Sequence, residues 1–214
     1  MEKDVVLAST AQEKDLGVIV DSGLTFSEHI ATQVNKANRI LGLIRRSFEW
    51  TDKDTVKTLY KSLVRPHLEY CNAVAFPRFA KDVKLLESVQ RRATKLVPQL
   101  RELPYTERLK ALDLSSLEYR RQQRDLIEAY KFMQGKYKVP SPPLKVDTSY
   151  RVTRGHDLRV SKQRCQKNIR QDFFALRVTD HWNNLPADIV LSHTVNTFKN
   201  RLDKFMSAKR YQFN

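Results

Sequence analysis

The sequence predicts a mainly α-helical fold: a helical bundle preceded by a short β-hairpin and followed by a helical extension. Several long stretches repeat apolar residues at helical spacing. Only 5 glycines occur in 214 residues, too few for a sheet-rich fold with many tight turns. We therefore expect a hairpin region at 1–26, a helical domain at 27–135, a basic linker at 136–162 and a helical extension at 163–214.

β-branched residues are concentrated in the N-terminal region. Val5–Leu7 and Leu16–Val20 are short runs of this kind, separated by a polar connection, and they predict two strands or a hairpin. Two strands alone do not form a stable sheet. The hairpin is therefore expected to fray or to dock on the helices.

The first long helix is predicted from an apolar stripe that begins just after Ser27. Ser27 can cap this helix, and Arg39 and Arg46 lie opposite the stripe. The stripe consists of Ile30, Val34, Ala37, Leu41, Ile44 and Phe48. Burial of these side chains follows from the pattern.

Two further helical patterns surround a connection that contains Pro66. The first begins at Thr51, with Asp52 and Asp54 in its first turn, and Pro66 should end or kink it. Its apolar side is formed by Val56, Leu59, Tyr60 and Leu63, and its basic residues Lys53, Lys57 and Lys61 recur every four positions. The second has an apolar half formed by Val83, Leu85, Leu86, Val89, Ala93, Leu96 and Val97, and a basic half formed by Lys84, Arg91, Arg92 and Lys95.

The C-terminal half continues with shorter helices and one linker. A helix through Leu112 begins at Leu103-Pro104, and Ser115 with Glu118 forms a capping box for a helix that runs to about Gln134. Prolines mark the linker. Gly135 is the expected C-terminal cap of that helix. A helical pattern follows from Asp172 to Asn184, in which Trp182 is either a core residue or a base-stacking residue. Thr194 caps the last expected helix.

The charge balance favours a polyanionic partner. Lys and Arg number 39 against 24 Asp and Glu, which gives a net charge of +15 and a pI near 9.9. Such a surface can bind phosphates without recognising base sequence, and its affinity should fall with salt. The candidate contacts are Lys53, Lys57, Lys61, Lys84, Arg91, Arg92 and Lys95 in the helices, and Arg159, Lys162, Arg164, Lys167 and Arg170 in and after the linker.

Two alternatives remain for these cations. The helix faces can be merely solvated, with ion pairs such as Glu87 to Arg91, and the segment 145–170 can be a solvated linker rather than a flexible RNA-binding one. A membrane surface is not expected, because the helices carry acids among the bases and lack a strongly apolar aromatic face.

The sequence contains no catalytic pattern. Carboxylates are not paired for two-metal chemistry, the five histidines are scattered, and Cys71 and Cys165 are too few for a zinc site. We therefore predict no catalytic residue, no metal ligand and no cofactor. Without an apolar signal peptide or spanning segment, the chain is expected to be intracellular, in the nucleus or cytoplasm.

Several long motifs resemble a known enzyme family in the same order along the chain. LYKSLVRPHLEYCNAV and DVKLLESVQRRATK are similar to the region after the polymerase palm in reverse transcriptases of non-LTR retrotransposons of the jockey and chicken-repeat type. EKDLGVIVDSGLTFSEHI resembles the segment that joins palm to thumb, and LSSLEYRRQQRDLIEAYK and FFALRVTDHWNNLP resemble the C-terminal region. The resemblance implies a thumb-like bundle without the catalytic carboxylates, which in this family lie in the palm and hold Mg²⁺.

The resemblance also implies partners and two further site residues. Leu16 and Gly17 would be primer-grip residues, although an ordinary edge strand explains them as well. The expected partners are RNA, an RNA/DNA duplex or a DNA duplex, bound weakly and without sequence specificity. A missing palm domain is a further candidate partner. The alternatives are a domesticated, standalone nucleic-acid-binding protein and a helical protein-interaction remnant.

Overall fold

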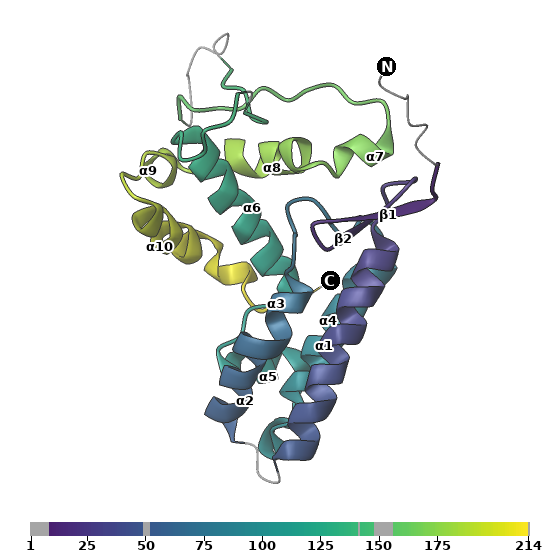
Figure 1. Ribbon diagram of the computed structural model, residues 1–214. Helices are drawn as coiled ribbons and strands as arrows, with labels where there is room; N and C mark the ends of the chain where they lie inside the picture. Colours follow the sequence, from purple (N-terminus) through teal and green to yellow (C-terminus); the bar gives the residue numbers. More distant parts are fainter. Residues whose placement is uncertain (1–8, 49–51, 141, 148–155, 214) are drawn as a thin grey trace.

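Helices make up most of the protein, and a two-stranded hairpin precedes them (Figure 1). The computed structural model describes residues 9–48, 52–140, 142–147 and 156–213. The predicted fold class, mainly helical with an N-terminal hairpin and a C-terminal helical extension, is confirmed. The elements are β1 (Gln12–Asp15), β2 (Val18–Asp21), α1 (Ser27–Ser47), α2 (Lys53–Leu59), the π-helical turn η1 (Tyr60–Val64), α3 (Arg65–Leu68), α4 (Ala80–Thr94), η2 (Pro98–Leu100), α5 (Tyr105–Leu112), α6 (Leu117–Met133), α7 (Asn168–Gln171), α8 (Phe174–Asn183), α9 (Ala187–Val190), α10 (Val195–Met206) and η3 (Ser207–Lys209).

The hairpin differs from the prediction in its first strand. β1 and β2 pair antiparallel, so the segment predicted as a polar connection is itself a strand, and Val5–Leu7 lies outside the described residues. Leu16 and Gly17 form the turn with φ of 45° and 82°, as in the type I′ turns that suit two-residue hairpins. Tyr70 Oη donates to the Leu16 carbonyl at 2.6 Å, which docks the hairpin on the helices.

α1 buries the predicted stripe but begins differently. Its stripe residues from Ile30 to Ile44 are at most 7% exposed, whereas Phe48 follows the end of the helix and is 42% exposed. The N-cap residue is Phe26, with φ of 57°, and Ser27 does not cap the helix. The Ser27 hydroxyl instead donates to Asp82 Oδ2 at 2.6 Å, which ties the start of α1 to the start of α4.

A π-helical turn changes the register of the next helix. Asp52 is the N-cap of α2 and accepts from two backbone N–H groups, while Thr51 lies outside the described residues. In η1 each turn takes more residues than in an α-helix. Val64 is therefore fully buried and Leu63, predicted to be apolar-side, is 46% exposed. An α-helix would need a hydrogen bond from the N–H of residue 66 to the preceding turn. Pro66 has no N–H, and the π turn lies where this bond would be absent. The helix ends at Leu68.

α1, α3, α4 and α5 enclose the first core, which extends from Ile30 to Leu117. On α4, Leu86, Val89 and Ala93 are buried as predicted, whereas Leu85 is 37% exposed because it lies at the edge of the apolar half. α6 is capped by Ser116 rather than Ser115: the Ser116 hydroxyl accepts from the Tyr119 N–H at 3.3 Å.

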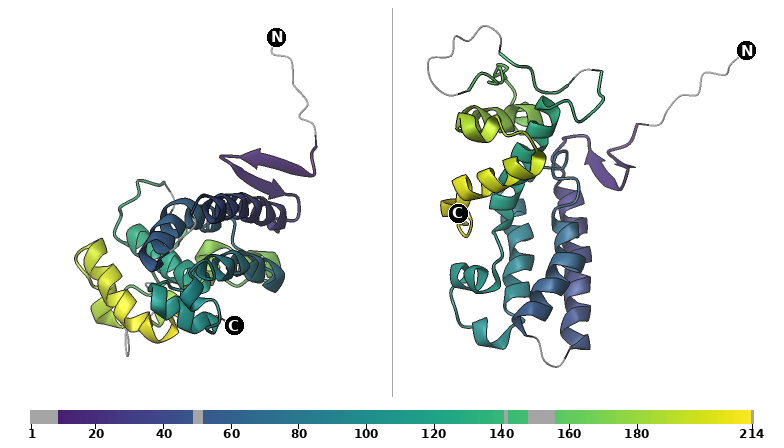
Figure 2. Two further views of the ribbon diagram at one scale, coloured as in Figure 1. Left: turned by 90° about the horizontal axis from the view of Figure 1, so that it is seen from below. Right: turned by 90° about the vertical axis from the view of Figure 1, so that its left-hand side faces the viewer.

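α6 leads from the first core to a second one, formed with α8, α9 and α10 (Figure 2). Trp182 is 0% exposed in this core, so its core role is confirmed. Thr194 caps α10, and Gly135 ends α6 with φ of 61°, both as predicted. The two cores divide near Leu117, within the range predicted as one helical domain, so α6 serves both.

Two parts of the predicted linker are docked on the second core. Leu144 and Val160 are buried, and Val146 and Val160 form an antiparallel β-bridge. Asn183 holds Val160 through hydrogen bonds to its N–H and carbonyl at 2.8 and 2.9 Å. The segments around Leu144 and Val160 are therefore not freely solvated, whereas residues 136–140 are exposed.

Candidate nucleic-acid interface

α4 carries four predicted cations on its solvent side. Lys84, Arg91, Arg92 and Lys95 are all exposed, and none forms an ion pair with a described residue. We call these four residues the α4 basic face. Its charges are available to an external anion because the opposite side of the helix makes the core contacts.

Two side chains of the α4 basic face are held in place by local contacts. The Arg91 guanidinium lies over the Tyr105 ring at 4.3 Å and over the Phe213 ring at 5.1 Å. Arg92 donates to the Ser88 carbonyl and hydroxyl at 3.4 and 3.3 Å. These contacts reduce the rotamer freedom that would be lost when either guanidinium binds a phosphate. The alternative ion pair from Glu87 to Arg91 is not formed.

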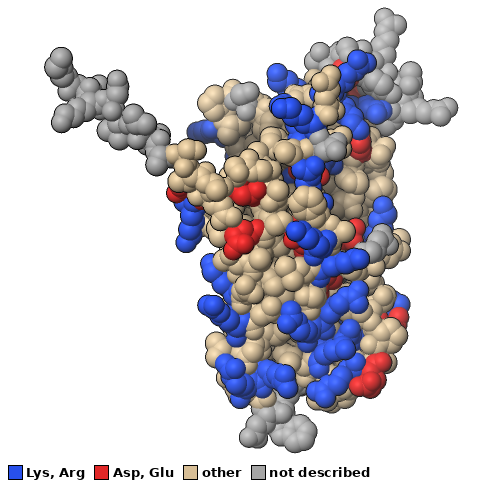
Figure 3. Space-filling view, turned by 90° about the vertical axis from the view of Figure 1, so that its right-hand side faces the viewer, with Lys and Arg blue, Asp and Glu red and all other residues tan. Residues whose placement is uncertain are grey.

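α1 adds cations that the predicted site did not include. α1 packs against α4, and the two helices run in the same direction from the joined residues Ser27 and Asp82. Their C-terminal ends therefore lie at the same end of the bundle. Figure 3 shows Lys and Arg side chains gathered over the lower part of the face that α1 and α4 form. The exposed cations of α1 are Lys36, Arg39, Arg45 and Arg46.

A buried arginine lies beside the same face. Arg108 of α5 is 4% exposed, and its Nε and Nη1 have no hydrogen-bond partner. Its guanidinium lies 5.5 Å from the centre of the Tyr105 ring, on which Arg91 also stacks. Burial and the charge of Arg91 both lower the Arg108 pKa, although a guanidinium stays charged at neutral pH. The sequence pattern missed Arg108 because it falls on the apolar side of a short helix.

Part of this charge has a structural explanation. Arg45 and Arg46 are in the last turn of α1, and Arg91 and Arg92 are in the last turn of α4. A cation at a helix C-terminus is stabilised by the helix dipole by about 0.3–1 kcal/mol. Because water or a phosphate can still bind the same guanidinium groups, this explanation does not compete with anion binding.

The predicted row of Lys53, Lys57 and Lys61 is divided in the structure. Lys57 forms an ion pair with Asp113 at 3.2 Å, and Asp113 is also bonded by Arg210. Burial lowers the pKa of Lys61, and the charges of Lys57 and Arg65 lower it further. Lys53 is exposed at the start of α2. Of these three lysines, Lys57 alone therefore has an ion-pair partner among the described residues.

The second predicted group lies at the other end of the molecule, next to α8 (Figure 1). Lys162 forms an ion pair with Asp180 at 2.6 Å, and Arg170 donates to the side chain of Gln163 at 3.2 Å. Arg159 is half-buried, and Arg164 and Lys167 are exposed. The structure does not bring this group together with the α4 basic face, so the two do not form one continuous site.

Leu16 and Gly17 are accounted for by the hairpin turn. Leu16 is 86% exposed, and a Cβ at Gly17 would lie 3.2 Å from Tyr70 Oη. A side chain at position 17 would also be strained by the positive φ. The two residues shape the turn; their assignment as primer-grip residues stays a prediction.

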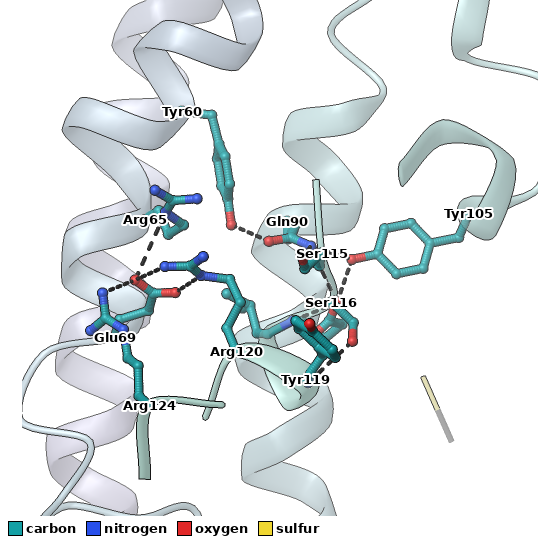
Figure 4. A network of polar contacts seen from close by, with 12 residues as sticks. Tyr60, Arg65, Glu69, Gln90, Tyr105, Ser115, Ser116, Tyr119, Arg120 and Arg124 are labelled. Carbon is teal, nitrogen blue, oxygen red and sulfur yellow. Dashed lines mark hydrogen bonds and ion pairs between the residues drawn. The ribbon is translucent and has the colours of Figure 1, made fainter. Parts of the chain in front are cut away.

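Two buried carboxylates, those of Glu69 and Glu87, belong to a polar network between α3, α4, α5 and α6 (Figure 4). Glu69 is bonded by Arg65, Arg120 and Arg124. Glu87 accepts from Tyr105 Oη and from the Leu117 N–H. Burial raises the Glu87 pKa, although these hydrogen bonds oppose the increase. Both carboxylates are thus bound by protein donors.

Among the described residues, no group of three or more His, Cys, Asp or Glu side chains could hold a metal ion. Within the described helices, none is long and apolar enough to cross a membrane.

Comparisons with known proteins give no relative: no family model, no curated protein and no solved structure matches this chain. The functional assignment therefore depends on the residues themselves and on the resemblance noted in the sequence motifs.

Proposed function

We propose that this protein binds the phosphate backbone of nucleic acid through the α4 basic face and the adjoining cations of α1, without catalysing a reaction. The observation that carries the proposal is a group of unpaired cations on two adjoining helices. Lys84, Arg91, Arg92 and Lys95 form no ion pair with a described residue, and neither do the exposed Lys36, Arg39, Arg45 and Arg46 of α1. Unpaired cations on one face are the electrostatic footprint of a phosphate-binding protein.

The chemistry of the face favours backbone contacts over base recognition. Arginine presents a planar fork of donors that matches phosphate oxygens, and lysine adds a mobile point charge. Two aromatic rings contact the face: Tyr105 is buried, Phe213 is half-buried, and Arg91 stacks on both, so neither offers an open platform for base stacking. Binding is therefore weak, similar for different sequences and strongly dependent on salt.

The resemblance to the thumb region of reverse transcriptases supports RNA, an RNA/DNA duplex or a DNA duplex as the ligand. In that family the palm domain supplies the carboxylates that hold Mg²⁺ for polymerisation. Accordingly, the isolated chain should give no template-dependent product in a primer-extension assay with Mg²⁺ and deoxynucleotides. Such a product would overturn the non-catalytic part of the proposal.

The test is fluorescence anisotropy with labelled single-stranded RNA, an RNA/DNA hybrid and duplex DNA at a series of salt concentrations. The triple variant Arg91→Gln, Arg92→Gln, Lys95→Gln should weaken binding to every ligand. For duplex DNA, the log–log salt slope should flatten by up to about 0.9 per lost phosphate contact. Circular dichroism should show an unchanged fold.

A matched control separates the site from the net charge. Lys110→Gln, Lys131→Gln, Lys162→Gln removes three charges that already form ion pairs with Glu107, Glu128 and Asp180. This variant should bind nearly as the wild type does. Equal losses in both triple variants would mean that only the overall charge matters, and no binding at low salt would favour the protein-interaction alternative.

A further inference from the structure

A half-open cavity lies between the two cores. Its volume is about 420 Å³, within the range of about 300–1,000 Å³ typical of small-molecule sites. α6 and α8 form one side, and Phe76, Pro77 and Val83 form the other. No residue of the α4 basic face lines it, so this junction cavity is separate from the proposed nucleic-acid interface.

Arg121 lines the junction cavity with an unsatisfied guanidinium. The residue is 4% exposed, and it forms no hydrogen bond or ion pair with any described residue. Its Nη1 is fully enclosed without a partner. A buried guanidinium with five N–H donors and no acceptor is unfavourable. Such a group therefore indicates a missing acceptor at this place.

The nearest carboxylates do not supply that acceptor. Glu87, Glu118, Glu69 and Asp125 stabilise the charge of Arg121 from a distance, because each of them raises its pKa while burial lowers it. Glu69 is bonded by three other arginines. Asp125 accepts from Arg177 Nε and Nη2 at 2.8 and 2.9 Å. The acids around Arg121 are thus either occupied or out of contact with it.

We propose that the junction cavity binds a small organic carboxylate, whose charged group pairs with Arg121. Phe76, Val83 and Val178 provide apolar contacts for the body of such a ligand. Two further cations line the cavity: Arg177, which is paired with Asp125, and Lys209. A singly charged group fits better than a phosphate dianion, because Glu87 and Glu118 already place negative charge near Arg121. A guanidinium binds a carboxylate with two parallel hydrogen bonds.

The ligand would also join the two halves of the molecule. Val83 belongs to α4, and Val178 belongs to α8 in the second core, so one ligand contacts helices from both sides of the division. A ligand that binds only the folded protein raises its thermal midpoint as its concentration increases. Binding can therefore be followed without knowledge of the natural ligand.

The test uses benzoate, phenylacetate and hexanoate as probes, with benzamide, phenylacetamide and hexanamide as neutral counterparts of the same shape. Titration by two-dimensional NMR gives each dissociation constant, and thermal shift gives an independent measure. At least one carboxylate should bind about tenfold or more tightly than its amide, because the charge-assisted hydrogen bonds are lost in the amide. If no carboxylate binds at millimolar concentration, or if the amides bind equally well, the proposal is wrong.

Two variants locate the binding to this cavity. Arg121→Met keeps much of the side-chain volume and should abolish the preference for carboxylates. Val83→Phe fills the apolar side of the cavity and should weaken carboxylate binding about tenfold or more while leaving nucleic-acid binding unchanged. Retention of the carboxylate preference in folded Arg121→Met, or unchanged carboxylate affinity in folded Val83→Phe, would overturn the assignment, and Val83→Phe decides the matter if Arg121→Met does not fold.

Discussion

The polar side chains on the two sides of α4 differ in their partners. On the inner side, Gln90 accepts from Tyr60 at 2.5 Å and donates to Tyr105 and to the Ser115 carbonyl, each at 3.0 Å. Glu87, one turn earlier, is bonded to Tyr105 and Leu117. On the outer side, the α4 basic face has no ion pair with any described residue. The inner contacts fix where the neighbouring helices lie, whereas the outer charges have no comparable structural task.

This difference predicts which substitutions affect folding and which affect only binding. Buried polar networks are costly when they lose one member, because the remaining groups stay buried without partners. Exposed charges are solvated and can be removed with little change in stability. The following predictions test this division, from the largest expected effect to the smallest.

The largest effect is expected from a charge on the inner side. Val89→Asp places an unpaired carboxylate at a position that is 0% exposed, and it should lower the free energy of unfolding by about 4 kcal/mol or more. The control is Lys84→Asp, which puts the same side chain on the outer side of α4 and should cost less than about 1 kcal/mol. Urea denaturation measures both. Similar losses for the two variants would contradict the division.

The second effect concerns the carboxylate that joins α3 to α6. Glu69→Gln removes the charge that Arg120 and Arg124 contact, and we expect a loss of about 3 kcal/mol, because the half-buried Arg120 guanidinium loses its counter-charge. Glu107→Gln breaks the exposed pair with Lys110 and should cost less than about 0.5 kcal/mol. Thermal unfolding of both variants provides the comparison. Equal stability of Glu69→Gln and the wild type would show that the network is not needed.

The sequence predicted the inner apolar side better than the inner polar one. The stripes of α1 and α4 follow directly from helical periodicity, and they lie in the first core as expected. The prediction that Leu63 lies on the apolar side of its helix was wrong. A π-helical turn, which has no clear apolar signature, shifts the register by about one residue. The prediction that Ser27 caps α1 was wrong, because its hydroxyl donates a hydrogen bond to Asp82, which is far away in the sequence.

For the candidate sites too, the sequence predicted features within one helix but not contacts between elements. Exposed cations on one helix can be identified from spacing, as for Lys84, Arg91, Arg92 and Lys95. Whether a cation meets an acid from another element depends on the tertiary fold, as for Lys57 with Asp113 and Lys162 with Asp180. Arg121 could not be recognised as a lining residue, because its neighbours in the cavity come from four separate parts of the chain.

The third effect is a pH dependence at Glu87. Burial raises the pKa of Glu87 above its usual 4.5, so the folded protein holds this proton to higher pH than the unfolded chain does. The contribution of Glu87 to the free energy of unfolding is therefore most favourable below pH 4.5. It is progressively lost as the pH rises through the pKa of Glu87 in the folded protein. Glu87→Gln has no titrating carboxyl group, so its stability should not show this loss. Urea denaturation at a series of pH values should thus show the variant gaining stability relative to the wild type as pH increases; parallel curves would contradict the assignment.

The smallest effect separates two neighbouring cations of the α4 basic face. Arg91 stacks on Tyr105 and Phe213, so Arg91→Gln should weaken nucleic-acid binding and also cost about 0.5 kcal/mol of stability, the size of an exposed cation–π contact. Lys95 has no ring contact among the described residues, so Lys95→Gln should weaken binding and leave the thermal midpoint unchanged. Anisotropy titrations and thermal unfolding on the same preparations distinguish the two roles. If Lys95→Gln also lowers stability, the outer side of α4 carries structural contacts, and the contrast between its two sides fails at that position.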